Sequence, residues 1–315
     1  MGLQLMMSKK AIKKCFAITV LSLLILCTEG ERNNPSDPGG SNYQAPRINY
    51  IQPLDTTVIE GNSVKFKVSA SNADYYQWKR GYGGYENVGV NSNYYSFTAS
   101  SSHNNKSIWC IVSNEYGSDT SNRAYLTVLP NHDITVFYDG FSNDNNPNGW
   151  WISNLQSYIK TWISDGYYYI DYDNLGRTIG LLLHVSDLNL NGDFTVEISA
   201  EYMSGLTDSK FGLIFYASSD QQDYYRFGIE NEKKYEIYKR YDGEWKALVN
   251  PKYNSAINSY LTNILKIIKV GNNTYFYIND ILVAEEYISS IYGNRFGFFV
   301  SEQIQVRFDY IKITR

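Results

Sequence analysis

The chain has 315 residues, of which 43% are hydrophobic, and this length is enough for two packed domains rather than one. Its formal net charge of −4 argues against a nucleic-acid partner, because that binding rests on lysine and arginine neutralising phosphates. The cysteines are Cys15, Cys27 and Cys110, and two of these three lie at the N-terminus. A disulfide framework or a zinc cluster is therefore not expected in the folded part.

The first 27 residues have the composition of an export signal. Four lysines between Lys9 and Lys14 precede an apolar run, Phe16 to Leu26, which has signal-peptide length and is too short to span a bilayer comfortably. Removing these four of the 28 basic residues leaves 24 against 32 acidic ones, a net charge of −8. The order Leu24-Ile25-Leu26-Cys27 resembles a bacterial lipobox, although Leu26 stands where that motif has a small residue.

The lipobox resemblance implies that residues 1–27 are a signal peptide and that Cys27 becomes acylated. We therefore predict export to the cell envelope as an outer-membrane or cell-surface lipoprotein. The alternatives are an ordinary secretory signal or an uncleaved anchor, with Cys27 incidental. Residues 28–46 are rich in Asn, Gly, Pro and Ser, have few apolar residues and are predicted to be a flexible linker.

Residues 47–130 have the alternating pattern of short strands. Apolar residues occupy every second position from Ser63 to Ala70, and a second core strand is expected from Ile108 to Asn114. Regular strands and turns of this kind favour a β-sandwich. Several motifs of this module resemble an immunoglobulin-like domain of the I-set type, namely Glu60 to Val64, Tyr76 to Trp78, Cys110 to Ser118 and Leu126 to Val128.

The immunoglobulin resemblance implies a sandwich without its usual disulfide. Val68 stands at the first cysteine position, so Cys110 has no partner, and Ile108 replaces the corner tyrosine. Cys110 is expected to be a small buried hydrophobic residue, with a redox or nucleophilic role as the alternative. Such modules act as spacers or protein-binding units. A cluster of loop tyrosines (Tyr75, Tyr82, Tyr85, Tyr94 and Tyr95) is either a contact patch or ordinary strand and turn tyrosine.

Residues 134–315 consist of strands and tight turns. We predict eleven strands between Tyr167 and Ile313, with hairpins at Asp242-Gly243 and Asn279-Asp280, and hence two packed antiparallel sheets. The order of motifs resembles concanavalin A-like and laminin-G-like jelly-roll domains. These motifs are Tyr138 to Phe141, Gly149-Trp150, Lys210 to Phe215, Tyr224 to Phe227, Asp242 to Trp245, Leu265 to Ile267, Tyr275 to Asn279, Arg295 to Phe298 and Val306 to Ile313. The whole chain is thus predicted to be all-β.

Alternation along these strands predicts one polar sheet face made of Glu197, Glu201, Tyr216, Tyr224, Arg226, Glu230, Tyr238 and Arg240. The jelly-roll resemblance implies that this face is concave and holds a sugar, and sugars need aromatic faces and planar polar groups. The expected ligand-binding residues are Tyr216, Tyr224, Arg226, Glu230, Tyr238 and Arg240, with Trp151 and Trp162 from the start of the module. A solvated face with cross-strand ion pairs is the alternative. Trp245 is expected to pack at the edge of the core.

The chain lacks the motifs of the common hydrolases and nucleotide-binding enzymes. Glycosidases of the resembled fold need paired carboxylates, as in Glu-x-Asp-x-x-Glu, and this spacing does not occur. Glu197 and Glu201 alternate onto one side of a strand and could form such a pair. We therefore predict that the protein is not an enzyme.

Calcium is the one cofactor that the sequence suggests. Asp144 to Gly149 and Asp187 to Gly192 begin like calcium loops, with oxygen ligands at alternate positions, but each lacks the acidic residue at the twelfth position. Asn-rich turns are the alternative. The jelly-roll resemblance implies a structural calcium ion near the termini of the module, with Asp139 and Asp309 as contributors, and Asp144 of the first loop is the third candidate ligand.

Together these features predict a non-catalytic binding protein of the cell envelope. The jelly-roll module would bind carbohydrate, the immunoglobulin-like module would be a spacer, and a lipid anchor would reach the membrane. The alternative is a protein-interaction or structural envelope lipoprotein without a sugar site, whose partner is an envelope or extracellular protein. The third hypothesis for the function is a glycosidase-like enzyme.

Overall fold

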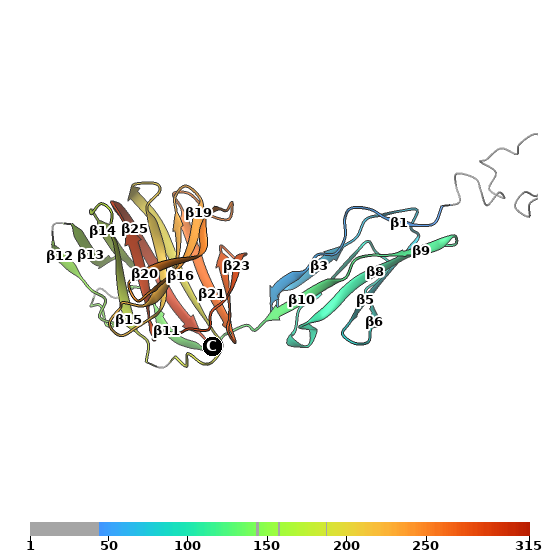
Figure 1. Cartoon of the computed structure of the whole chain (residues 1–315), viewed down its shortest axis with the longest axis horizontal. Coiled ribbons are helices and arrows are strands. Elements are labelled where there is room, and N and C mark those ends of the chain that lie inside the picture. The colour runs from blue at the N-terminus through green and yellow to red at the C-terminus, as the bar shows by residue number, and fades with distance from the viewer. Residues whose placement is uncertain (1–43, 143–144, 157, 187) are drawn as a thin grey trace, which may run out of the picture. The chain divides into compact units, whose positions relative to one another are not determined.

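A computed structural model of the chain describes residues 44–142, 145–156, 158–186 and 188–315 (Figure 1). The chain folds as two compact units, one ending at Val128 and the other beginning at Leu129. The described residues contain strands and a single 3-10 turn, so the prediction of an all-β chain is confirmed. None of their helices could cross a membrane. The predicted signal segment, Cys27 and most of the predicted linker lie outside the described residues.

The first unit consists of three β-sheets. The largest has the order β2-β10-β8-β5-β6, with β9 also paired to β8, and the smaller ones are β3-β7 and β1-β4. Its strands are β1 (Arg47–Ile48), β2 (Thr56–Ile59), β3 (Ser63–Lys67), β4 (Ala70–Ser71), β5 (Tyr75–Gly81), β6 (Glu86–Val88), β7 (Tyr94–Thr98), β8 (Lys106–Asn114), β9 (Gly117–Thr120) and β10 (Ala124–Leu129).

The core of the first unit lies between the β3-β7 sheet and the large sheet. Val64 and Phe66 of β3 are buried with Trp78 of β5 and Cys110 of β8, and Val68 belongs to the same cluster. The predicted alternation from Ser63 is therefore correct for these apolar positions, although the strand itself ends at Lys67. Cys110 is a free thiol, as predicted, and burial raises its pKa to about 12.

Because Cys110 is inaccessible and its thiolate is disfavoured, we expect its modification to require unfolding. In a Cys15→Ser, Cys27→Ser chain, the native protein should react with a thiol-specific disulfide reagent at least about a thousandfold more slowly than the urea-unfolded protein. The same background carrying Ser118→Cys, at an exposed position of β9, is the reactive control. Rapid native labelling of Cys110 would contradict the packing described here.

The second unit is a sandwich of two antiparallel sheets. Its strands are β11 (Thr135–Asp139), β12 (Ser153–Gln156), β13 (Ile159–Ser164), β14 (Tyr167–Tyr172), β15 (Thr178–His184), β16 (Phe194–Gly205), β17 (Lys210–Ala217), β18 (Tyr224–Glu230), β19 (Lys234–Tyr241), β20 (Glu244–Tyr253), β21 (Thr262–Val270), β22 (Asn273–Ile278), β23 (Ile281–Tyr287), β24 (Arg295–Ser301) and β25 (Ile304–Thr314).

One sheet of the second unit has the order β15-β24-β17-β18-β19-β20, and we call it the six-stranded sheet. The other, the nine-stranded sheet, has the order β12-β13-β14-β25-β16-β21-β22-β23, with β11 also paired to β25. Apolar side chains from both sheets form one buried cluster, as expected for two packed layers. The second unit is thus a two-sheet jelly-roll sandwich.

Candidate functional site

The outward face of the six-stranded sheet carries a row of glycines at its centre. Gly212 of β17 is paired with Gly228 of β18 and with Phe299 of β24, and Phe299 is also paired with Gly180 of β15. The ring of Phe299 fills the space over Gly228, where a Cβ atom would lie 2.5 Å from Cζ of that ring. Because these glycines have no Cβ atom, the ring of Phe299 can pack directly over the sheet, where it is fully buried.

Arg226 of β18 lies beside the Phe299 ring, and its guanidinium is held in one position. Its Nη2 atom donates to Oε1 of Glu236 on β19 at 2.7 Å, and the two side chains are only 12% and 4% exposed. Its guanidinium lies 5.2 Å from the centroid of the Phe299 ring. A buried, charge-assisted pair of this kind fixes the guanidinium plane.

Aromatic side chains from the neighbouring hairpin cover the other side of Arg226. The guanidinium lies 4.5 Å from the ring centroid of Trp245 and 5.1 Å from that of Tyr238. Trp245 also packs edge-on against Tyr224 and Tyr238. Burial raises the pKa of Tyr224, although the charges of Arg226 and Arg240 oppose this, so its hydroxyl is a neutral hydrogen-bonding group at neutral pH.

The side chain of Arg226 reaches across the face toward β15. Thr178 of β15 lies three strands away from Arg226 in the order of the sheet. Its Oγ1 atom lies 3.5 Å from Nη1 of Arg226. We call the group formed by Thr178, Tyr224, Arg226, Glu236, Tyr238 and Trp245 the Arg226 surface.

Trp245 is the exposed aromatic member of this surface, at 43% of its area, and it therefore offers a flat apolar face to solvent. Its position follows from the hairpin at Asp242-Gly243, which pairs Trp245 with Arg240. An exposed indole beside fixed polar groups can stack on the apolar face of a ring-shaped polar ligand while hydrogen bonds set its orientation. The prediction that Trp245 packs at the core edge is wrong.

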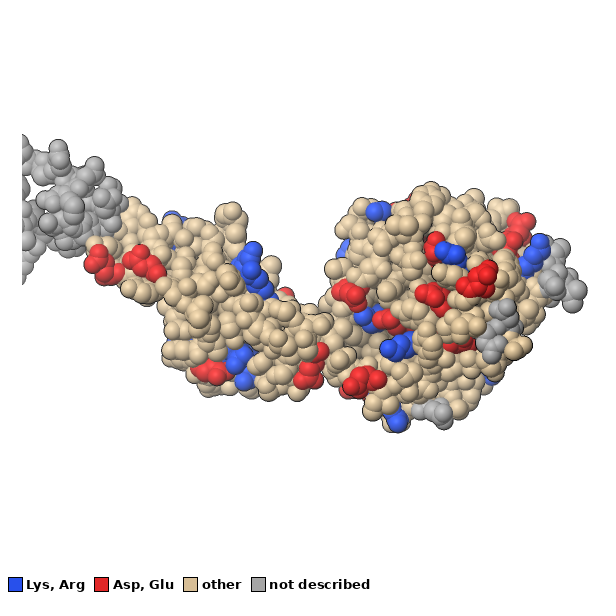
Figure 2. Space-filling model, turned by 180° about the vertical axis from the view of Figure 1, so that it is seen from behind, with Lys and Arg blue, Asp and Glu red and all other residues tan. Residues whose placement is uncertain are grey.

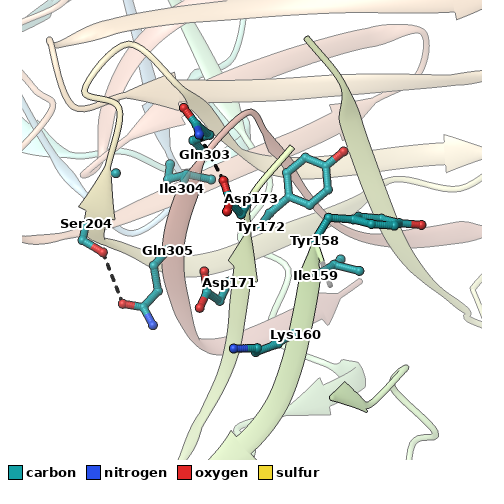
Figure 3. A pocket seen from close by; sticks show the side chains of 11 residues that line it. Tyr158, Ile159, Lys160, Asp171, Tyr172, Asp173, Ser204, Gln303, Ile304 and Gln305 are labelled. Atoms are coloured by element: carbon teal, nitrogen blue, oxygen red, sulfur yellow. Dashed lines mark hydrogen bonds between the residues drawn. The ribbon is translucent and has the colours of Figure 1, made fainter. Parts of the chain in front are cut away.

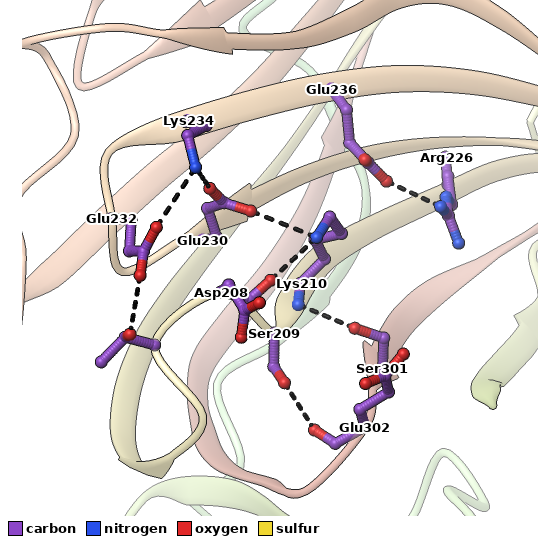
Figure 4. Close-up of polar contacts among 11 residues, drawn as sticks. Asp208, Ser209, Lys210, Arg226, Glu230, Glu232, Lys234, Glu236, Ser301 and Glu302 are labelled. Carbon is purple, nitrogen blue, oxygen red and sulfur yellow. Dashed lines mark hydrogen bonds and ion pairs between the residues drawn. The ribbon is translucent and has the colours of Figure 1, made fainter. Parts of the chain in front are cut away.

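A second row of charges crosses the same face (Figure 4). Glu230 is 3% exposed and lies 3.2 Å from Nζ of Lys210 and 2.8 Å from Nζ of Lys234. The backbone N–H of Lys210 also donates to the hydroxyl of Ser301. Glu230 was predicted to contact ligand, but here its carboxylate is buried and engaged by two lysines, which corresponds to the cross-strand ion pairs of the alternative reading.

The structure corrects the placement of Tyr216. Alternation predicts this side chain on the outward face, but Tyr216 is completely buried and packs edge-on against Phe194, Phe296 and Tyr225. The cause is a register shift between Ile214 and Ala217, where Tyr216 adopts a φ of +56°. Such a bulge breaks the alternation, so consecutive side chains both enter the core.

The remaining predicted ligand residues are only partly brought together. Tyr224, Arg226, Tyr238 and Arg240 lie on the six-stranded sheet, where Arg240 donates to Oε1 of Gln222 at 3.0 Å. Trp162 lies on β13 of the nine-stranded sheet, stacked on Tyr169 with ring centroids 4.8 Å apart. Trp151 precedes β12 of that sheet and is 40% exposed. Neither tryptophan therefore joins the Arg226 surface.

Glu197 and Glu201 are also on the other sheet, contrary to the predicted common face. Both belong to β16 of the nine-stranded sheet. Glu197 accepts from the hydroxyl of Tyr310 at 2.6 Å, and Glu201 is paired with Arg307 at 2.8 Å. These partners give both carboxylates a structural role in the sheet.

Of the residues predicted to hold calcium, the structure describes Asp139 and Asp309. Asp139 is buried, and its carboxylate already accepts from the backbone N–H of Phe141, from Nδ2 of Asn148 and from Nε1 of Trp150. Asp309 is exposed on β25, and Asp144 and Asp187 lie outside the described residues. Across the described ranges, no three acidic, His or Cys side chains are grouped as metal ligands. The hydrogen bonds of Asp139 link the end of β11, near the start of the second unit, to Trp150 in the core.

Charged side chains of both signs are interspersed on the faces of the two units visible in Figure 2. This mixture gives those faces no continuous basic stripe of the kind that tracks a phosphate backbone. Recognition on such a surface depends on local geometry rather than on long-range attraction.

No protein-family model and no curated protein sequence matches the chain. Among solved structures, the carbohydrate-binding module CBM66 from Bacillus subtilis is 16% identical, with a TM-score of 0.36, over 57% of this chain and 97% of that one. A Bacillus subtilis protein of unknown function with a galectin-like fold is 10% identical, with a TM-score of 0.41, over 58% and 97%. The GH43 protein BlXynB from Bacillus licheniformis is 11% identical, with a TM-score of 0.44, over 66% of this chain and 51% of that one. The chain thus spans about half of the last structure.

Proposed function

We propose that this chain is a non-catalytic carbohydrate-binding protein of the cell envelope, with its glycan site on the Arg226 surface. The observation that carries the proposal is the half-exposed indole of Trp245 over the buried pair of Arg226 and Glu236. Sugars present apolar ring faces flanked by hydroxyl groups, and an aromatic platform with fixed polar neighbours complements both. The residues of the Arg226 surface come from β15, β18, β19 and β20, an arrangement that suits an extended glycan lying across the strands.

A glycan array probed with the full chain tests this function. We expect binding to a restricted set of polysaccharides or oligosaccharides, with unbranched segments that can lie across the face. Absence of binding above background, with a folded protein by circular dichroism, would favour the protein-interaction alternative. The first unit offers that alternative a surface, because Tyr82 and Tyr85 at one hairpin are 83% and 65% exposed.

We infer that the first unit is an immunoglobulin-like spacer. The inference is supported by the cluster in which Val68, Trp78 and Cys110 pack between the two facing sheets. These positions correspond to the first disulfide cysteine, the core tryptophan and the second cysteine of the resembled family. Packing of a valine against an unpaired cysteine would replace the disulfide in such a unit.

We further propose that Cys27 carries a lipid anchor, which rests on the apolar run ending in Leu24-Ile25-Leu26-Cys27. In a bacterial host, incorporation of labelled palmitate into the chain is expected to be abolished by Cys27→Ala and unaffected by Cys15→Ala. Labelling that survives Cys27→Ala would exclude this anchor. An unlabelled but secreted wild-type chain would indicate an ordinary signal peptide.

A further inference from the structure

A second, separate site lies on the nine-stranded sheet, where a pocket of about 300 Å³ opens beside the ends of β13, β14, β16 and β25 (Figure 3). This volume is at the small end of the range for ligand pockets, about 300 to 1,000 Å³. It suits one small molecule rather than a length of polymer. The lining residues are Tyr158, Ile159, Lys160, Asp171, Tyr172, Asp173, Ser204, Gly205, Gln303, Ile304 and Gln305.

The register of the sheet brings the polar lining groups together. Lys160 of β13 is paired with Asp171 of β14, Asp171 with Gln305 of β25, and Gln305 with Ser204 of β16. The four side chains thus form one cross-strand row on the outward face, opposite the buried Ile159, Tyr172 and Ile304. Figure 3 shows Lys160, Asp171 and Gln305 directed toward the same space.

Two hydrogen bonds orient the amides of this pocket. Nε2 of Gln303 donates to Oδ1 of Asp173 at 3.0 Å, and the hydroxyl of Ser204 donates to Oε1 of Gln305 at 3.3 Å. The second bond leaves Nε2 of Gln305 as a donor toward the pocket. Within the described part of the chain, the side chains of Lys160 and Asp171 form no hydrogen bond or ion pair with each other or with another residue.

The backbone also shapes this pocket. Gly205 adopts a φ of +114°, and a Cβ atom there would lie 2.2 Å from the carbonyl oxygen of Gln303. The close approach of β16 to the turn before β25 therefore depends on a glycine. Tyr158, which is 42% exposed, adds an aromatic wall.

We propose that this pocket binds a single neutral sugar unit or a related small polyol. Each hydroxyl of such a ligand both donates and accepts, and the pocket presents the matching set, with carboxylate acceptors on Asp171 and Asp173 and donors on Lys160 and Gln305. An anion would face two carboxylates, and a bare cation would face the ammonium and the amide N–H groups. The aromatic wall at Tyr158 can cover the apolar side of the ring. The site is independent of the Arg226 surface.

Saturation-transfer NMR with the full chain and a panel of methyl glycosides (glucoside, galactoside, mannoside and N-acetylglucosaminide) tests this site. We expect transfer to at least one glycoside in the wild type, with binding about tenfold or more weaker in Asp171→Ala. Asp165→Asn, at an exposed turn between β13 and β14, is the matched control and should bind like the wild type. Repeating the measurement in a Trp245→Ala background removes any contribution of the Arg226 surface to the transfer.

The outcomes separate this site from the proposed function. Loss of transfer when Asp171→Ala is added to the Trp245→Ala background, with an unchanged melting temperature, supports the pocket whatever the glycan array shows. Retention of transfer in that double variant, or absence of transfer from every glycoside, overturns the pocket. Array binding that is lost in Trp245→Ala supports the Arg226 surface in either case.

Discussion

Replacing Trp245 with alanine is expected to weaken binding of the strongest glycan found on the array by about ten- to a hundredfold, because buried aromatic anchors contribute roughly 1.5–3 kcal/mol at interfaces. The folded state should change little, since Trp245 is 43% exposed at the outer edge of the sheet. Isothermal titration of the wild type and Trp245→Ala with that glycan gives the ratio of dissociation constants. Thermal melts of both proteins check that the fold is retained.

Trp151→Ala is the matched control for this experiment. Trp151 has the same chemistry and nearly the same exposure, 40%, but precedes β12 of the nine-stranded sheet. Its replacement should leave the affinity unchanged. Equal losses in the two variants would show that the effect of Trp245 is not specific to the Arg226 surface. A loss of affinity confined to Trp151→Ala would support the prediction from sequence that Trp151, near the start of the second unit, contacts ligand.

Glu236→Ala is expected to be the most destabilising of the substitutions considered, with a loss of about 3–5 kcal/mol in the free energy of unfolding of the second unit. The reason is that it leaves the charge of Arg226 without its partner, in a side chain that is only 12% exposed. Urea unfolding followed by circular dichroism, with separate transitions fitted for the two units, measures this change.

A double replacement separates the charge from the packing. Combining Glu236→Leu with Arg226→Met removes both charges and should recover most of the lost stability, as buried pairs often allow. Asp280→Ala breaks a contact of 2.6 Å with Lys266. Because the carboxylate of Asp280 is 76% exposed, this substitution should lower the free energy of unfolding far less. Similar losses for Glu236→Ala and Asp280→Ala would contradict the buried character of the Arg226 pair.

The strands with strong period-two patterns could be predicted from the sequence. Phe194 to Tyr202, Tyr224 to Glu230 and Arg295 to Val300 are all strands of the sandwich. The strands β11, β12, β13 and β23 were missed. In β13 the buried positions Ile159 and Thr161 alternate with the exposed Lys160, but only one of the buried pair is apolar, so the pattern is weak.

The candidate site was predicted in part, and the errors have identifiable causes. Alternation places a side chain on one side of its strand, but it does not reveal which sheet that strand joins, and so Glu197 and Glu201 were grouped wrongly with Arg226. The bulge at Tyr216 leaves no signal in the sequence, because it depends on packing against β24. Both errors arise from contacts between residues that are distant along the chain.

Trp245 and Glu236 could have been found from local patterns. A two-residue turn at Asp242-Gly243 pairs Arg240 with Trp245, which places both on one face. Glu236 lies two residues before Tyr238 and four before Arg240, so the same alternation brings it to that face. Hairpin register is thus a more informative guide to this site than the composition of single strands.

Hydrogen-exchange mass spectrometry of the full chain, with and without the glycan selected on the array, tests the location of the site most directly. We predict that the glycan slows amide exchange in β18, β19 and β20, from Tyr224 to Tyr253, and leaves residues 44–128 unchanged. Protection confined to the first unit, or to β13 and β14 of the nine-stranded sheet, would contradict a glycan site on the Arg226 surface.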